Sequence, residues 1–331
     1  MAVKEVFIWL LVSVFFATAS GRGLDQVTQK KHGDTYNQTI TLVLVKFASA
    51  VYTDDAASLL SWSCPRCIGL TKGFQIADLI VDEPHCLQAF VGVSNILPAI
   101  VVAFRGTQER SFHNWLEDLY WKQLDFGYPG VTDAMVHHGF YSAYHNTTLR
   151  PRLIVAIQSL ILKRPELPIM ITGHSMGGAM AAFCALDLTV NYGMENIDVV
   201  TFGQPRIGNP SFASYYNAYV PKTIRMTHNH DIVPHLPPYY SILDNWTYHH
   251  SAREVWIYKI AFGILNYETQ KICDGTGEDP DCSRSVIGNS ISDHLEYLGT
   301  VLRTDHSHDP EDSLLSALGA PEGPRNWYKQ R

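Results

Sequence analysis

Hydrophobic positions along the chain follow two alternating patterns. Short apolar or β-branched runs occur at 88–93, 99–104, 168–172, 197–202, 223–227 and 254–258. Between and before them, the stretches 39–52, 111–121, 153–163 and 176–190 have the spacing or composition of helices. Strands that alternate with helices favour a mostly parallel sheet covered by helices on both faces. We therefore predict an α/β fold in one domain, because no Pro-, Gly- or Ser-rich linker interrupts the pattern.

The first residues carry a targeting pattern. Lys4 precedes an apolar run from Val6 to Phe16, and the small residues of Ala17–Gly21 follow it. This layout is typical of a secretory signal peptide, and a run of about 11 residues is shorter than the roughly 20-residue helix that spans a bilayer. We expect a signal peptide at 1–20, a folded domain at 21–304 and a polar C-terminal tail at 305–331. An uncleaved anchor or a buried N-terminal helix would also fit the first segment.

Composition and charge limit the possible cellular compartments and binding partners. Sequons at Asn37, Asn146 and Asn245 are predicted glycosylation sites, which agrees with a secreted or luminal protein. A net charge of -7 over 331 residues, without a Lys/Arg cluster, leaves no electrostatic footprint for nucleic acid. No later apolar stretch is long enough for a transmembrane span, and no polybasic segment favours anionic membranes. The sequence predicts no particular oligomeric state.

The six cysteines fit an oxidising compartment. Cys273 and Cys282 flank a short, polar, turn-rich segment, and we predict a disulfide between them because closing such a loop costs little chain entropy. The acidic residues 274–281 inside that loop lack the EF-hand pattern and are expected to be solvated rather than to bind calcium. Cys184 lies in a small, apolar helical run and is expected to be a buried free thiol.

The remaining three cysteines have no predicted pairing. The set comprises Cys64, Cys67 and Cys86. The spacing of Cys64 and Cys67, with His85 beside Cys86, is compatible with zinc. A secreted chain without a second C-x-x-C makes that interpretation the weaker one, so we expect no metal site.

The segment Gly173-His-Ser-Met-Gly177 carries the clearest chemical signal. It matches G-x-S-x-G, with a predicted strand before it and a predicted helix after it, as this motif requires. The sharp turn exposes the hydroxyl of Ser175, and side chains at Gly173 or Gly177 would collide where strand and helix cross. A tight glycine turn with an incidental serine would give the same letters. We predict that Ser175 is a nucleophile and that the backbone N–H of Met176, at the helix N-terminus, stabilises an oxyanion.

A serine nucleophile needs a base and a carboxylate that orients it. In the fold that carries this motif, the carboxylate and then the histidine follow the serine in the sequence. Asp231 comes directly after the strand at 223–227, where the carboxylate is expected. The histidine is not determined by the pattern alone. The candidates downstream of the serine include His294 and the set His235, His249, His250, His306 and His308.

Several motifs in one order resemble the class 3 lipase family, which includes fungal triacylglycerol lipases and plant relatives. The matching stretches between Cys64 and Gly299 are Phe104–Thr107, Asn114–Trp115, His138–Phe140, Gly173–Gly178, Phe202–Asn209, Asp231–Pro238 and Asp293–Gly299. The resemblance implies an α/β-hydrolase fold in which Asp231 and His294 complete the triad with Ser175. It also implies a second oxyanion donor at Thr107, where many fungal relatives have serine. Such a mechanism needs no metal or organic cofactor.

An amphipathic stretch after the predicted oxyanion loop bears on the substrate. Phe112, Trp115, Leu116 and Leu119 form a helical stripe. Such stripes are commonly core packing, but the family's lid lies here, so we expect a lid and a lipid ester substrate at a lipid–water interface. Phospholipase A1 or galactolipase activity stays open, as does a soluble esterase resembling the feruloyl esterases of the family. A peptidase or thioesterase with the same triad and a non-catalytic lipid-binding relative are also compatible with the sequence.

Overall fold

The computed structural model describes residues 36–304, except 109–113, 120–123, 125, 240–246 and 263–264. These residues belong to the compact unit that begins at Tyr36. Four sequence predictions lie outside the described residues: the signal peptide at 1–20, the tail at 305–331, the lid residue Phe112 and the sequon at Asn245. Within the described part, no helix has both the length and the apolar character needed to span a membrane.

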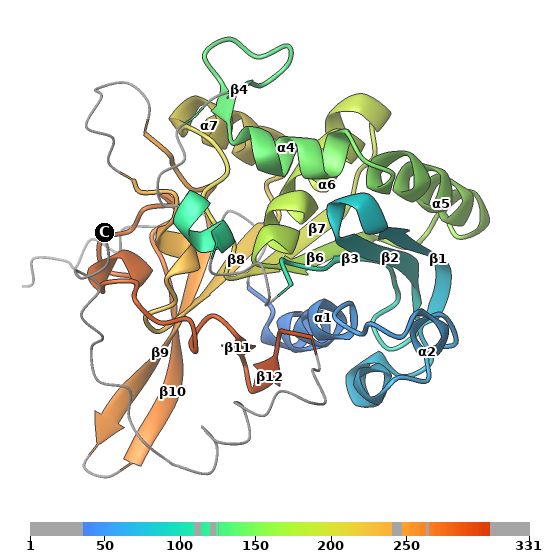
Figure 1. The fold of residues 1–331 in the computed structure, drawn as a ribbon, viewed down its shortest axis with the longest axis horizontal. Coiled ribbons are helices and arrows are strands. Elements are labelled where there is room, and N and C mark those ends of the chain that lie inside the picture. The colour runs from blue at the N-terminus through green and yellow to red at the C-terminus, as the bar shows by residue number, and fades with distance from the viewer. Residues whose placement is uncertain are drawn as a thin grey trace, which may run out of the picture. The chain divides into compact units, whose positions relative to one another are not determined.

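An eight-stranded sheet forms the centre of the fold (Figure 1). Its strand order is β1-β2-β3-β6-β7-β8-β9-β10. The five strands from β3 to β9 run parallel, whereas β1, β2 and β10 pair antiparallel with their neighbours. The strands are β1 (Gln75–Asp82), β2 (Leu87–Ser94), β3 (Ala99–Phe104), β6 (Ile169–His174), β7 (Ile197–Phe202), β8 (Thr223–His228), β9 (Glu254–Phe262) and β10 (Leu265–Ile272).

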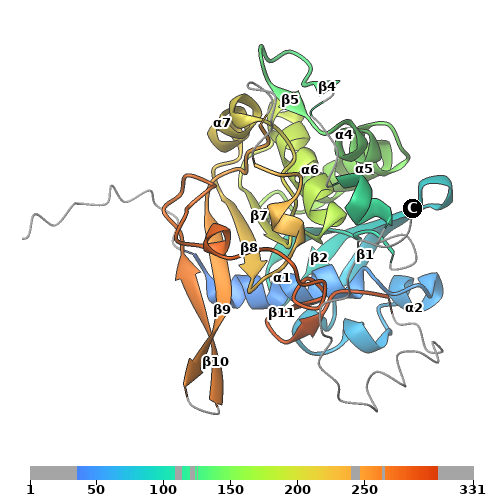
Figure 2. The same cartoon turned by 60° about the vertical axis from the view of Figure 1, so that its left-hand side comes forward.

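Helices cover both faces of this sheet, as the alternating pattern predicts (Figures 1 and 2). Besides the helical residues 114–119, the α-helices are α1 (Gln38–Ala50), α2 (Ala56–Leu60), α4 (His138–His145), α5 (Leu149–Lys163), α6 (Met176–Tyr192) and α7 (Pro210–Tyr219). Two minor two-stranded sheets pair β4 (Phe126–Gly127) with β5 (Met135–Val136) and β11 (Glu296–Tyr297) with β12 (Thr300–Val301). The predicted α/β class is correct.

Alternation along the central strands divides the core into two halves. On β3, Val102 and Phe104 point toward α4, α5 and α6, and Val101 and Ala103 point toward α1. All six residues of β3 are buried, so the strand appears in the sequence as an uninterrupted apolar run. This double burial fixes the carboxyl ends of β3, β6 and β8, which carry the loops described below.

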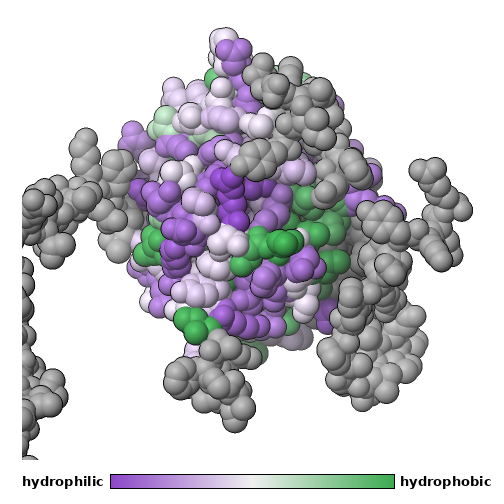
Figure 3. All heavy atoms as spheres, turned by 90° about the vertical axis from the view of Figure 1, so that its left-hand side faces the viewer, coloured by the Kyte–Doolittle hydropathy of each residue, from purple (hydrophilic) through white to green (hydrophobic). Residues whose placement is uncertain are grey.

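Strands β9 and β10 form a long hairpin at one end of the sheet, and it extends away from the helices (Figure 2). The face of the molecule on this side is mostly polar, with hydrophobic residues gathered in separate patches (Figure 3).

Candidate active site

Ser175 lies in the sharp turn between β6 and α6. Its backbone has φ 60° and ψ -129°, a strained conformation for a residue with a side chain. The neighbouring glycines allow the turn, because a Cβ at Gly173 would lie 2.3 Å from the carbonyl oxygen of Gly177. A Cβ at Gly177 would approach the carbonyl oxygen of Phe104 equally closely. Within the described residues, the buried Ser175 Oγ makes no hydrogen bond.

Asp231 and His294 meet although 63 residues separate them. His294 Nδ1 lies 2.9 Å from Asp231 Oδ2, and the second carboxylate oxygen accepts the Val233 N–H at 2.8 Å. A carboxylate can only accept, so the His294 proton sits on Nδ1 and Nε2 carries the lone pair. That is the tautomer required to take a proton from a serine hydroxyl.

Tyr297 is a third partner of this carboxylate, and sequence reasoning gave it no role. Its hydroxyl donates to Asp231 Oδ2 at 2.5 Å. Burial, followed by the negative charge of Asp231, raises the pKa of Tyr297 well above its ordinary value, so the hydroxyl keeps its proton and donates. The only sequence signal for Tyr297 is its position in the Asp293–Gly299 stretch that resembles the family.

The nucleophile turn and the histidine loop are joined through the residue before Ser175. The rings of His174 and His294 have centroids 4.3 Å apart, and His174 Nε2 lies 2.8 Å from the carbonyl oxygen of His294. The structure therefore places the loops carrying Ser175, Asp231 and His294 at one edge of the sheet. The other three candidate histidines within the described residues bond to backbone carbonyls, His235 to that of Asp231, His249 to that of His250 and His250 to that of Pro234.

The two predicted oxyanion residues are also adjacent. Strands β3 and β6 are parallel neighbours, with Phe104 opposite Gly173, so the loop after β3 lies beside the nucleophile turn. The Thr107 hydroxyl is 3.8 Å from the Met176 sulfur. A Cβ at Gly106 would lie 3.1 Å from Ser175 Cβ.

Residues 114–119 form a helix beside this site. Leu119 is buried, and the half-buried Trp115 and Leu116 pack against the hydrophobic core on the α6 side of the sheet. A cavity of about 590 Å³ lies below the helix. Its lining is Trp115, Glu117, Asp118, Leu119, His137, Gly139, Phe140 and Met176. The cavity thus connects the helix to the residue that follows the nucleophile.

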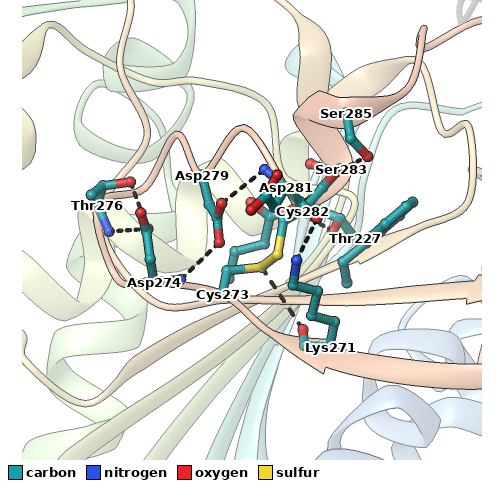
Figure 4. Close-up of a disulfide and its surroundings, with 12 residues drawn as sticks. Thr227, Lys271, Cys273, Asp274, Thr276, Asp279, Asp281, Cys282, Ser283 and Ser285 are labelled. Atoms are coloured by element: carbon teal, nitrogen blue, oxygen red, sulfur yellow. Dashed lines mark hydrogen bonds between the residues drawn. A yellow bond between two sulfur atoms is a disulfide. The ribbon is translucent and has the colours of Figure 1, made fainter. Parts of the chain in front are cut away.

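The structure contains the predicted disulfide and a second one. Cys273 is bonded to Cys282 (Figure 4). The second disulfide joins Cys64 to Cys67 and so removes the two thiolates that a zinc site would have needed. Cys86 and Cys184 are free, and Cys184 is buried as expected.

The acidic loop of the first disulfide departs from its prediction. Glu278 and Asp279 are buried rather than solvated. Both oxygens of Glu278 accept from Arg206, at 2.7 and 2.8 Å. Asp279 accepts the backbone N–H groups of Asp274 and Asp281 (Figure 4). Burying these carboxylates is tolerated because each is hydrogen-bonded. The loop therefore has a structural role.

Comparisons with known proteins agree with this geometry. A sequence model of the class 3 lipase family matches residues 101–241. The lipase of Rhizomucor miehei is 32% identical over 243 residues, which is 72% of this chain and 62% of the relative. The chain spans about three fifths of the length of the curated relatives that match it first.

Two solved structures extend the likeness over most of the chain. A triacylglycerol lipase described as having a serine protease triad is 30% identical with a TM-score of 0.67, covering 81% of this chain and 98% of its own. A fungal lipase–inhibitor complex that served as a model for interfacial activation is 29% identical with a TM-score of 0.68, covering 82% and 98%. The fold is thus that of an α/β-hydrolase. More narrowly, the chain belongs to the class 3 lipase family.

Proposed function

We propose that this chain is a carboxylic ester hydrolase that cleaves lipid esters, with an activity like that of triacylglycerol lipases. The observation that carries the proposal is the buried contact of 2.9 Å between His294 Nδ1 and Asp231 Oδ2, beside a strained serine turn. In this proposal Ser175 is the nucleophile, His294 the general base and acid, and Asp231 the carboxylate that orients the base.

The reaction proceeds in two halves. His294 Nε2 takes the proton of the Ser175 hydroxyl while Oγ bonds to the ester carbonyl carbon, and the carbonyl oxygen becomes an oxyanion. The tetrahedral intermediate then expels the alcohol, which receives the proton from His294. Water, deprotonated by His294, attacks the acyl-enzyme, and the acid leaves as Ser175 regains its proton. Asp231 stabilises the imidazolium during each half.

The oxyanion is stabilised by the backbone N–H of Met176, aided by the positive end of the α6 dipole, and by Thr107. The approach of Gly106 to Ser175 supports this assignment, because it brings the loop after β3 beside the nucleophile.

The helix at 114–119 acts as a lid in this proposal. Its apolar residues Trp115 and Leu119 line the cavity beside Met176, where the acyl chain of a substrate would lie. Contact with a lipid surface offers these side chains a second apolar environment, so the lid opens there and exposes the cavity.

The domain boundaries and the compartment are also part of the proposal. We infer a cleaved signal peptide at 1–20, a lipase domain at 21–304 and a tail at 305–331. Asn37 and Asn146 are exposed, which supports glycosylation at both sequons. N-terminal sequencing of the secreted protein should begin near residue 21, and glycosidase treatment should lower its mass; an intact N-terminus or an unchanged mass would contradict each inference separately.

The deciding experiment follows hydrolysis of tributyrin through its solubility limit, with Ser175→Ala as the blank. We expect the rate to jump when droplets form. A smooth saturating curve would instead indicate a soluble esterase without interfacial opening. A wild-type rate equal to the blank would refute tributyrin hydrolysis, and phospholipids and galactolipids would then be assayed against the same blank.

A further inference from the structure

A buried chain of hydrogen bonds links three segments around the nucleophile. Tyr52 follows α1 and is 2% exposed; its hydroxyl lies 2.7 Å from His174 Nδ1. The same hydroxyl oxygen lies 3.1 Å from the backbone nitrogen of Gly106. At the opposite side of the ring, His174 Nε2 meets the carbonyl oxygen of His294 at 2.8 Å.

The direction of every bond in this chain follows from one fact. The carbonyl oxygen of His294 can only accept, so His174 carries its proton on Nε2. Its Nδ1 must then accept, and the Tyr52 hydroxyl donates to it. The oxygen of Tyr52 is thereby oriented to accept the N–H of Gly106.

The ring of His174 is held in the neutral form that this direction requires. Complete burial, followed by the nearby His294, lowers the pKa of His174 well below its ordinary value. A protonated ring would carry a donor at both nitrogens and would oppose the Tyr52 hydroxyl.

The two ends of this series of hydrogen bonds lie where the positions of backbone atoms matter for the reaction. Gly106 immediately precedes Thr107, so the bond from Gly106 to Tyr52 fixes the peptide plane next to the proposed oxyanion donor. The carbonyl bond holds the backbone of His294. Between them, His174 is covalently adjacent to Ser175.

We propose that Tyr52 and His174 are positioning residues, which hold the oxyanion loop and the His294 backbone in register with Ser175. This inference rests on the proposed function. It adds two side chains that touch no reacting atom and act through Gly106, Thr107 and His294.

Tyr52→Phe tests the inference, because it removes one hydroxyl and leaves the ring. With p-nitrophenyl butyrate as a dissolved ester, kcat should fall about tenfold at unchanged KM, less than the hundredfold or more that loss of a direct oxyanion donor costs. Affinity for butaneboronic acid, which forms a tetrahedral adduct with an active serine, should fall by the same factor. Tyr216→Phe is the matched control, since Tyr216 is fully buried and its hydroxyl bonds away from the site, to Thr223 at 2.8 Å.

His174 variants provide a second test. His174→Gln can still donate and accept, so it should retain more kcat than His174→Leu. The double variant Tyr52→Phe/His174→Leu should be no slower than His174→Leu alone, because both changes break one chain.

The outcomes separate this inference from the proposed function. If the wild type is active, any of three results would overturn the positioning role alone. These are an unchanged kcat in Tyr52→Phe, a change confined to KM, or additive effects in the double variant. A wild-type protein that neither hydrolyses esters above the Ser175→Ala blank nor binds the boronic acid would overturn both.

Discussion

The proposed catalytic cluster and the proposed lid differ sharply in how they are held. Ser175, Asp231 and His294 are each at most 2% exposed. In the helix at 114–119, Asn114, Glu117 and Asp118 are exposed, Trp115 and Leu116 are half-buried, and Leu119 is fully buried. The proposed catalytic residues are thus buried and contacted from several directions. The proposed lid helix, which would control access to them, contacts the rest of the protein mainly through one face.

The difference has an energetic consequence. The carboxylate of Asp231 accepts from His294, Tyr297 and the Val233 N–H, and hydrogen bonds to a charged group contribute about 1.5–3 kcal/mol each. Burying one leucine side chain contributes a similar amount, about 1.5–3 kcal/mol, but it is the only fully buried contact of the described lid helix. Under the proposed function, a lipid surface would therefore open the lid without disturbing the cluster.

Asp231→Asn should produce the largest effect. The asparagine amide can donate to His294 Nδ1, which would place the ring proton on Nε2 and remove the base. We expect kcat for p-nitrophenyl butyrate to fall roughly ten-thousandfold with the fold intact. Asp82→Asn changes another buried carboxylate, on the edge strand β1 and bonded to Thr148 rather than to a triad residue, and should leave kcat nearly unchanged. An Asp231→Asn enzyme with a tenth of wild-type activity would argue against the triad.

Leu119→Ala should act on the lid and leave the cluster intact. The loss of about 2 kcal/mol of packing in the closed form raises the ratio of open to closed lid by about thirtyfold at most. Hydrolysis of dissolved tributyrin should rise up to about thirtyfold, and the jump at droplet formation should shrink accordingly. Leu162→Ala, at a leucine 85% exposed on α5, controls for the substitution type. An unchanged jump would show that this helix does not control access.

The same contrast explains which features the sequence could predict. Central strands such as β3, β7 and β8 were predictable within about a residue because burial on both faces leaves a continuous apolar run. Strand β1 was missed because it lies at the sheet edge and carries Asp78 and Asp82 among its apolar residues. Helix α7 was missed too, because its aromatic residues have weak helix propensity and packing decides its structure.

The site residues also differ in whether a local sequence pattern could predict them. Ser175 and Asp231 carry local signals, namely the glycine turn and a position directly after a strand. His294 needed the family resemblance, because its contact with Asp231 crosses 63 residues. The role inferred for Tyr52 depends on a contact across 122 residues, and the burial of Glu278 on a partner 72 residues away. Contacts of this kind leave no periodicity in a single sequence.

The smallest predicted effect is a dependence of stability on pH that arises at His174, beside the cluster, and not in the lid. The pKa of His174 is lowered well below the value of about 6.5 expected in the unfolded chain. As the pH falls below about 6.5, the unfolded chain therefore binds a proton that the folded protein does not. The free energy of unfolding should decrease with falling pH, by at most about 1.4 kcal/mol per pH unit for this residue.

His174→Gln isolates that contribution, because glutamine does not titrate. Urea unfolding of wild type and variant between pH 7.5 and 5.5 should show a shallower decline in the variant, whereas His230→Gln, at an exposed histidine, should follow the wild type. Parallel curves for wild type and His174→Gln would mean that the ring already accepts a proton in the folded state. The directed hydrogen bonds from Tyr52 to His294 would then lose their physical basis. Burial also lowers the pKa of His250, which lies outside both regions, so only the part of the slope that His174→Gln removes is assigned to the buried side of the comparison.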